Sequence, residues 1–223
     1  MGADALLREM QGLLAGLYDV PVAHDVAQFL ITDAADAARL QGAAGAPPTD
    51  EQLLIAEGEE GVEVGLYVDA AVLGRLAVRC PMSALDEGNL ADFCTALEGV
   101  SHFHYFTWSA GYARPVSLLE LELQAEVDKY ASALRLMLGQ RDGRFPVDLF
   151  HRLFEHAGLL PHLGEEERSR YRQAHRFAAR FCRRLEERYL RRRLARPAAL
   201  LAELRAFYRL GSRAKVHHAA QWH

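Results

Sequence analysis

The segment from Glu98 to Tyr130 constrains the fold most strongly, because it joins a dense aromatic run to a helix whose start is clearly marked. Ser117 and Glu120 have capping-box spacing, in which the serine hydroxyl accepts a backbone N–H and the glutamate side chain bonds back to the cap residue. Apolar residues then recur at steps of three and four: Leu119, Leu123, Val127, Tyr130, Leu134 and Met137. This pattern predicts a helix over 117–139 with one buried face.

The aromatic run over 100–108, VSHFHYFTW, is rich in aromatic and β-branched residues, which is typical of a strand. Alternate side chains of a strand share a face, so His102 and His104 would point to the same side. The alternative is a helix that continues from the preceding segment, because Glu98 and His102 would then pair at four-residue spacing. Gly99 counts against that alternative, since glycine weakens a helix interior. We therefore expect an extended segment here.

A β-hairpin is predicted between residues 52 and 69. Residues 53–56 and 62–68 flank a turn rich in Glu and Gly, and the second arm alternates apolar with polar or small residues. Such alternation indicates a sheet with one buried face. A lone hairpin is marginally stable in water, so the run over 100–108 is the expected third strand. The predicted fold is α+β and helix-dominated, with a small antiparallel sheet packed on helices and a C-terminal helical bundle.

Helical periodicity and helix-start signals recur along the rest of the chain. They predict helices over 3–17, 24–31, 34–40, 70–77, 85–97, 146–158, 165–194 and 197–210. Gly and Pro indicate a loop over 41–49. We expect an α+β domain over 1–140, an Arg-rich helical region over 141–212 that could be continuous with it, and a flexible tail over 213–223.

Composition favours a cytoplasmic globular protein. Hydrophobic residues make up 50% and charged residues 25% of the 223 residues, as in ordinary globular proteins. No apolar run is long enough to cross a bilayer, so we expect no membrane association. The first residues include Asp4 and Glu9 and do not match a secretory signal. The three cysteines are widely spaced and odd in number, which favours free thiols in a reducing compartment.

Charge is strongly segregated along the chain. Up to Tyr130 there are 21 acidic and 6 basic residues, and from Ala131 there are 9 acidic and 20 basic ones, so balances of −15 and +11 combine to −4. Regions of opposite sign attract each other, within one chain or between molecules. The sequence has no phosphate loop, G-x-G-x-x-G, H-E-x-x-H or G-x-S-x-G motif. The leading hypothesis is therefore a non-enzymatic interaction or regulatory protein that binds a protein partner or a second copy of itself.

A metal-dependent enzyme or metal-binding module is the alternative, and it depends on His102 and His104. On a strand, their spacing suits two imidazole ligands of one metal ion. A carboxylate from Glu122, Glu126 or Glu98 would complete a two-histidine, one-carboxylate site for a divalent metal such as iron or zinc. The competing explanation is that both histidines are hydrogen-bonded residues of the core.

Nucleic-acid binding is a further alternative, suggested by arginines at every fourth position of the helix predicted over 165–194. They are Arg168, Arg172, Arg176, Arg180, Arg184, Arg188 and Arg192. Four residues turn a helix by about 400°, so the row winds round the helix by about 40° per step. Such a row could follow phosphates. Alternatively, the arginines form a solvated face and pair with the acidic N-terminal half.

Overall fold

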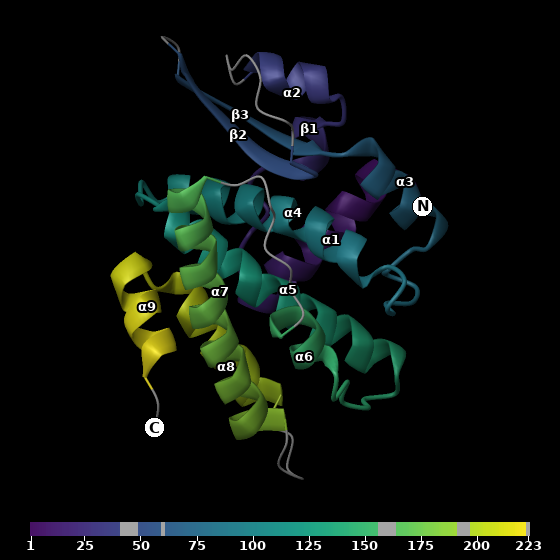
Figure 1. Cartoon of the computed structure of the whole chain (residues 1–223), viewed down its shortest axis with the longest axis vertical. Coiled ribbons are helices and arrows are strands. Elements are labelled where there is room, and N and C mark those ends of the chain that lie inside the picture. Colours follow the sequence, from purple (N-terminus) through teal and green to yellow (C-terminus); the bar gives the residue numbers. More distant parts are fainter. Residues whose placement is uncertain (41–48, 59–60, 156–163, 191–196, 222–223) are drawn as a thin grey trace.

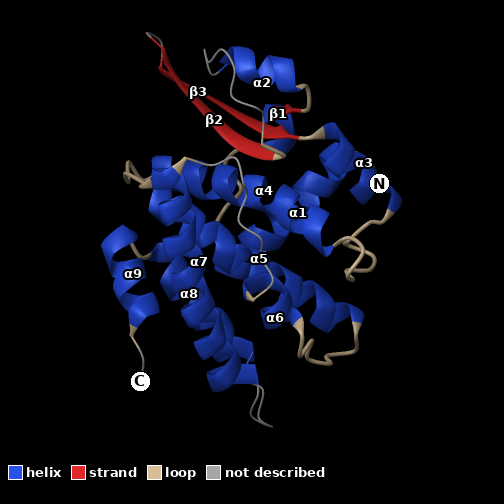
Figure 2. Ribbon diagram, in the orientation of Figure 1, coloured by secondary structure: helices blue, strands red, loops and turns tan. Residues whose placement is uncertain are grey.

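In the computed structural model, helices form most of the fold and a small three-stranded sheet covers one end of them (Figure 1). Figure 2 shows this sheet above most of the helices, with the short helix over 34–40 on its far side. The helix-dominated α+β fold is therefore confirmed. The structure describes residues 1–40, 49–58, 61–155, 164–190 and 197–221.

Most of the predicted helices form, although their ends differ from those expected. They are α1 (Ala3–Tyr18), α2 (Ala34–Leu40), α3 (Ala70–Val78), α4 (Leu90–Ala110), α5 (Leu118–Gln140), α6 (Leu149–Phe154), α7 (Glu165–Leu185), α8 (Pro197–Arg209) and α9 (Ser212–Ala220). Helix α7 continues into a π-helical turn, η2 (Glu186–Leu190). The helix predicted over 24–31 is instead a 3-10 turn, η1 (Val26–Phe29), followed by a short strand. The loop predicted over 41–49 lies, except for Thr49, outside the described residues.

The sheet contains the predicted hairpin, formed by antiparallel strands β2 (Glu51–Gly58) and β3 (Gly61–Val68). Its third member is β1 (Leu30–Ile31), which pairs in parallel with β3 and gives the order β1-β3-β2. The sheet is therefore mixed. The residues at 100–108 take no part in it.

The prediction of an extended segment over 100–108 is wrong, because these residues belong to α4. The side chains from Val100 to Tyr105 are all buried, since α4 lies between the sheet on one side and α1 and α5 on the other. A helix enclosed on all sides carries apolar and aromatic residues all round its surface. The composition that indicated a strand is thus explained by the central position of this helix.

Gly99 lies where the sheet packs most closely on α4. A Cβ atom at this position would come within 2.8 Å of Leu66 Cδ1 and 3.0 Å of Glu51 Oε2. Both distances are shorter than an ordinary van der Waals contact, so the missing side chain permits the close approach. Gly99 therefore brings Glu51, at the start of β2, against the face of α4 that carries Glu98 and His102.

The start of α5 is correctly predicted, but only half of the capping box forms. Ser117 Oγ accepts a hydrogen bond from the backbone N–H of Glu120 at 3.2 Å. The Glu120 carboxylate instead accepts hydrogen bonds from Tyr105 Oη at 2.6 Å and from Arg114 Nη2 at 2.7 Å. The cap fixes where α5 begins, and Glu120 ties this helix to α4.

The predicted regions 1–140 and 141–212 share a core, because one cluster of buried apolar side chains extends from Leu6 in α1 to Ala219 in α9. Helix α7 packs along α5 within this cluster. A flexible tail was expected over 213–223, but α9 covers most of that segment and buries Lys215 completely. Among the described residues, no helix has both the length and the apolar character needed to span a bilayer.

Candidate metal centre

A buried cluster of one imidazole and three carboxylates lies where β2, α4 and α5 meet. Glu98 and His102 are one turn apart on the same face of α4, and Glu122 reaches them from α5. Ligand atoms of these three residues all lie within 4.8 Å of one another. Glu51 approaches from the first position of β2. His102 and Glu122 are each only 6% exposed, so solvent screens their charges poorly.

The imidazole of His102 lies between two carboxylates. Its Nδ1 is 3.7 Å from Glu51 Oε2, and its Nε2 is 3.7 Å from Glu122 Oε2. Both distances exceed hydrogen-bond length. Among the described residues, these two carboxylate oxygens and His102 Nε2 are buried without a hydrogen-bond partner. Because buried polar atoms are almost always satisfied, the cluster has the geometry of a site that needs a further group.

The electrostatics of the cluster favour a cation. Burial alone would lower the pKa of His102, but the carboxylates of Glu51, Glu122 and Glu98 outweigh it and raise that pKa to about 9. Burial raises the pKa of Glu122 to about 7. Burial likewise raises the pKa of Glu51, against the opposing effect of His102. The concentrated negative charge attracts either protons or a metal ion.

The arrangement has the features that a metal ligand set with a supporting carboxylate would need. A metal-binding histidine commonly donates its second ring N–H to a carboxylate, which orients the ring and raises its basicity. Glu51 occupies that position beside Nδ1, while Nε2 faces Glu122. Glu98, His102 and Glu122 would hold the ion through two oxygens and one nitrogen. This donor set suits Zn²⁺, Fe²⁺ or Mn²⁺.

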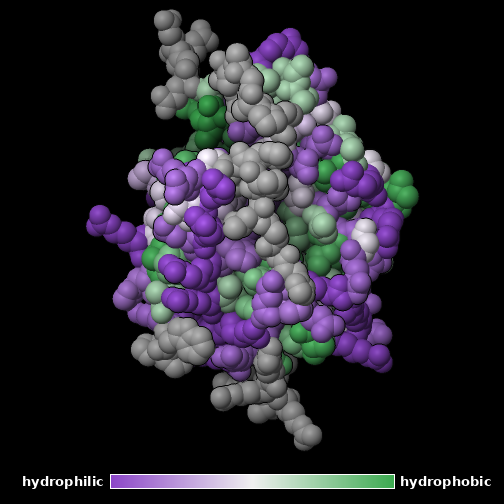
Figure 3. Space-filling model, viewed as in Figure 1, coloured by the Kyte–Doolittle hydropathy of each residue, from purple (hydrophilic) through white to green (hydrophobic). Residues whose placement is uncertain are grey.

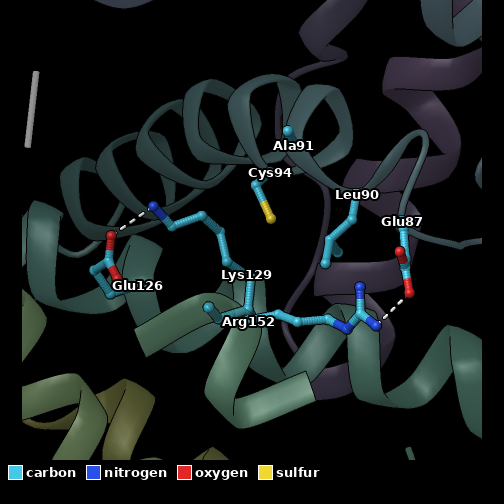
Figure 4. Close-up of a pocket in the computed structure, with 8 residues that line it drawn as sticks. Glu87, Leu90, Ala91, Cys94, Glu126, Lys129 and Arg152 are labelled. Atoms are coloured by element: carbon cyan, nitrogen blue, oxygen red, sulfur yellow. Dashed lines mark hydrogen bonds and ion pairs between the residues drawn. The ribbon is translucent and has the colours of Figure 1, made fainter. Parts of the chain in front are cut away.

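Lys129 fixes the position of Glu98. Its Nζ is 3.0 Å from Glu98 Oε2 and 2.5 Å from Glu126 Oε1. Burial opposes its charge, but the two carboxylates outweigh this effect and hold the pKa of Lys129 well above its usual value. Lys129 lines a cavity of about 260 Å³. Figure 4 shows the Cys94 sulfur pointing into this cavity. Burial raises the pKa of Cys94 to about 12, so this thiol stays protonated.

Two of the five predicted ligands lie outside the cluster. Glu126 pairs with Lys129 and with His175 Nδ1 at 2.9 Å, and these cations overcome the effect of burial and lower its pKa to about 2. His104 is two residues from His102, which on a helix is about 200° round the axis. Burial lowers the pKa of His104 to about 4. The structure therefore brings together Glu98, His102 and Glu122, and the expected pair of imidazoles does not form.

Three residues near the cluster were not predicted. Glu51 precedes the residues that indicated the hairpin. It lies close to His102 because the absence of a side chain at Gly99 lets β2 and β3 pack closely on α4. Arg170 lies on the same helix as the arginine row without belonging to it, and its Nε lies 4.0 Å from Glu122 Oε1. Burial and the charges of Glu122, Glu98 and Glu51 raise the pKa of Tyr171 above its usual range. Glu98, His102 and Glu122 were all among the predicted ligands, but the strand expected over 100–108 paired His102 with His104 rather than with Glu98.

The predicted arginine row divides into two parts along α7. Its N-terminal members, Arg168, Arg172, Arg176 and Arg180, are exposed and have no acidic partner within 4.0 Å among the described residues. We call these four residues the arginine face. Figure 3 shows hydrophilic side chains gathered over α7 in this view.

The C-terminal members of the row are held by the protein itself. Arg184 Nη1 donates to the carbonyl oxygens of His218 at 2.8 Å and Gln221 at 2.7 Å. Arg184 and Arg188 both lie within 4.0 Å of Glu203. Arg192 lies outside the described residues. These arginines therefore join α7 and η2 to the C-terminal helices.

Comparisons with protein-family models, with curated proteins and with solved structures found no match for this chain.

Proposed function

We propose that this chain is a metal-dependent enzyme that binds one divalent transition-metal ion through Glu98, His102 and Glu122. The observation that carries the proposal is the close approach of ligand atoms from Glu98, His102 and Glu122, of which His102 Nε2 and Glu122 Oε2 are buried without a hydrogen-bond partner among the described residues. An ion with two carboxylate ligands would offset their repulsion and satisfy His102 Nε2. Three protein ligands would leave a coordination position open, as in catalytic rather than structural zinc sites.

Metal titration of the untagged protein tests the proposal. After chelation and dialysis, we expect about one equivalent of Zn²⁺ or Mn²⁺ to bind per chain, because the three ligands form a single site. His102→Gln and Glu122→Gln should each weaken binding strongly. Glu187→Gln, at an exposed carboxylate of η2, is the matched control and should bind as the wild type does. Wild-type protein that binds no metal, or ligand variants that bind it unchanged, would contradict the proposal.

A second function, binding of an acidic protein surface, is supported by the arginine face. Its four guanidinium groups are exposed and without acidic partners among the described residues, and they rise by about 6 Å per step along α7. A second copy of the chain offers an acidic N-terminal half as one such surface. Charge complementarity of this kind chiefly accelerates association and makes it sensitive to salt.

Sedimentation analysis of the full chain at low and physiological salt tests this second function. We expect self-association that weakens as salt rises, because exposed charges are screened over about 8 Å at physiological ionic strength. The double variant Arg176→Glu/Arg180→Glu should abolish it. Association that is unchanged by salt and by the charge-reversal variant would exclude a charge-driven contact. Tight binding of the wild type, but not the variant, to a nucleic acid in a filter assay would instead assign the face to a polyanion.

A further inference from the structure

Arg170 connects the metal centre to the surface. Its side chain extends from α7 toward Glu122, with Nε 4.0 Å from Glu122 Oε1, and its Nη2 is 3.6 Å from Glu167 Oε1. Nε is buried and has no hydrogen-bond partner among the described residues. The centre therefore contains an unpartnered donor close to Glu122, whose Oε2 is also without a hydrogen-bond partner among the described residues.

A cavity of about 680 Å³ opens between α5 and α7 at this point. Leu119 of α5 and Ser169, Arg170, Arg172 and Gln173 of α7 line it, and Glu165 and Glu166 border it at the start of α7. Because Arg170 both lines this cavity and contacts Glu122, the cavity leads toward the metal centre. Its size suits a small molecule.

The charges at Arg170, where the cavity meets the proposed metal centre, indicate which molecules would bind. A divalent ion at Glu98, His102 and Glu122 would lie near the guanidinium of Arg170, and two cations in a poorly solvated site repel each other. An anionic oxygen between them would remove this repulsion and accept the unpartnered Nε–H. Guanidinium groups are well suited to carboxylates and phosphates because their planar array of N–H donors matches these anions.

We propose that the cavity between α5 and α7 binds a small carboxylate- or phosphate-bearing substrate, whose anionic oxygen lies between the metal ion and Arg170. This inference rests on the metal-dependent function proposed above. Arg170 would orient the anion, and Ser169 and Gln173 offer polar side chains to the rest of the substrate. The substrate would thus enter along α7 rather than through the separate cavity beside Lys129.

Anion binding to the Mn²⁺-loaded protein tests the inference, with inorganic phosphate and acetate as probes. Metal content is measured first. Calorimetry and Mn²⁺ electron paramagnetic resonance then measure the binding of each anion. The anion that binds more tightly identifies the substrate class. We expect anion binding to require the metal and to change the Mn²⁺ spectrum. In Arg170→Gln the metal should remain bound, whereas anion affinity should fall about 10-fold or more, because a charge-assisted hydrogen bond is lost.

Two further variants serve as a control and as a substitute for Arg170→Gln. Arg168→Gln removes an exposed arginine of the same helix that does not line the cavity, and it should bind the anion unchanged. Arg170→Lys replaces Arg170→Gln if that variant does not fold. It retains the positive charge, but its affinity for the anion should also fall, because the ammonium cannot reproduce the Nε–H geometry. Metal-loaded protein that binds neither anion, or binds them equally well without metal or without Arg170, would overturn this inference alone. Failure to bind metal would overturn the proposed function as well.

Discussion

At the scale of single residues, the proposed metal centre depends most on His102. Its two ring nitrogens face different carboxylates, Glu51 at Nδ1 and Glu122 at Nε2. In a metal site this division gives the nitrogens separate roles, because one binds the ion and the other is held by a supporting acceptor. Glu51 should therefore influence metal affinity without binding the metal itself.

Glu51→Gln tests that role. Removing the charge behind Nδ1 makes the imidazole a weaker ligand, so we expect metal affinity to fall about 10-fold or more while the stoichiometry stays the same. The matched control is Glu63→Gln, an exposed glutamate on the neighbouring strand. Calorimetric titration measures both. Unchanged affinity in Glu51→Gln would assign Glu51 a purely structural role.

Asp128 is a second buried carboxylate whose surroundings predict a pH effect. It accepts hydrogen bonds from Tyr18 Oη, from Ser101 Oγ at 2.6 Å and from Gln124 Nε2 at 2.7 Å. Burial outweighs these hydrogen bonds and raises the pKa of Asp128 to about 6. The folded protein therefore holds this proton more tightly than the unfolded chain, in which an aspartate has a pKa of about 3.9.

The stabilising contribution of protonated Asp128 should be complete below about pH 4 and lost as the pH rises through about 6. The change amounts to about 3 kcal/mol in the free energy of unfolding. In Asp128→Asn the side chain no longer titrates, so the stability of the wild type relative to the variant should decrease over this interval. Urea unfolding at several pH values measures the difference. A difference that stays constant with pH would contradict the assignment.

At the scale of elements, the contact between β2 and α4 positions the centre, and Gly99 permits it. Gly99→Ala should bring the new methyl group against Leu66 and Glu51 and lower the free energy of unfolding by about 1–3 kcal/mol, despite the better helix propensity of alanine. Gly12→Ala in α1 is the control, because nothing lies within 4 Å of its Cβ position, and it should gain about 1 kcal/mol. Thermal and urea unfolding report both values. Equal gains in the two variants would show that the sheet does not press on Gly99.

The elements that could be predicted from the sequence are those that have a local signal of their own. The β2–β3 hairpin and the start of α5 have local signals, namely alternation and the Ser117 cap. Helix α4 lacks a distinctive local signal, because a helix buried on all sides and a strand draw on the same aromatic and apolar residues. Gly99 counted against a helix on propensity alone, whereas its role is to accommodate a neighbouring sheet. Of the centre, Glu98, His102 and Glu122 were among the five predicted ligands, whereas Glu51 was not predicted, because its approach to His102 depends on the packing of β2 against α4.

At the scale of the whole molecule, the centre lies where the acidic and basic halves of the chain meet. Arg170 and His175 of α7 contact Glu122 and Glu126 of α5, and Arg152 of α6 pairs with Glu87. Part of the charge segregation in the sequence is thus used inside the fold. The arginine face has no acidic partner within 4.0 Å among the described residues, and only the packing of α5 against α7 separates these arginines from Arg170.

Metal binding at this junction should stabilise the entire chain. An ion that binds only the folded state adds about 2.7 kcal/mol to the free energy of unfolding when its free concentration is 100 times its dissociation constant. We expect this gain in the wild type and its loss on chelation. Glu122→Gln should show little gain at the same metal concentration. Equal unfolding midpoints with metal and with chelator would mean that the ion does not bind the folded centre.

X-ray absorption at the zinc edge of the loaded protein tests the central claim most directly, because it identifies the atoms bound to the ion. Coordination by Glu98, His102 and Glu122 predicts only nitrogen and oxygen ligands at about 2.0–2.2 Å, including an imidazole contribution that disappears in His102→Gln. Sulfur ligands at about 2.3 Å, or an imidazole contribution that persists in this variant, would place the metal elsewhere and contradict the account.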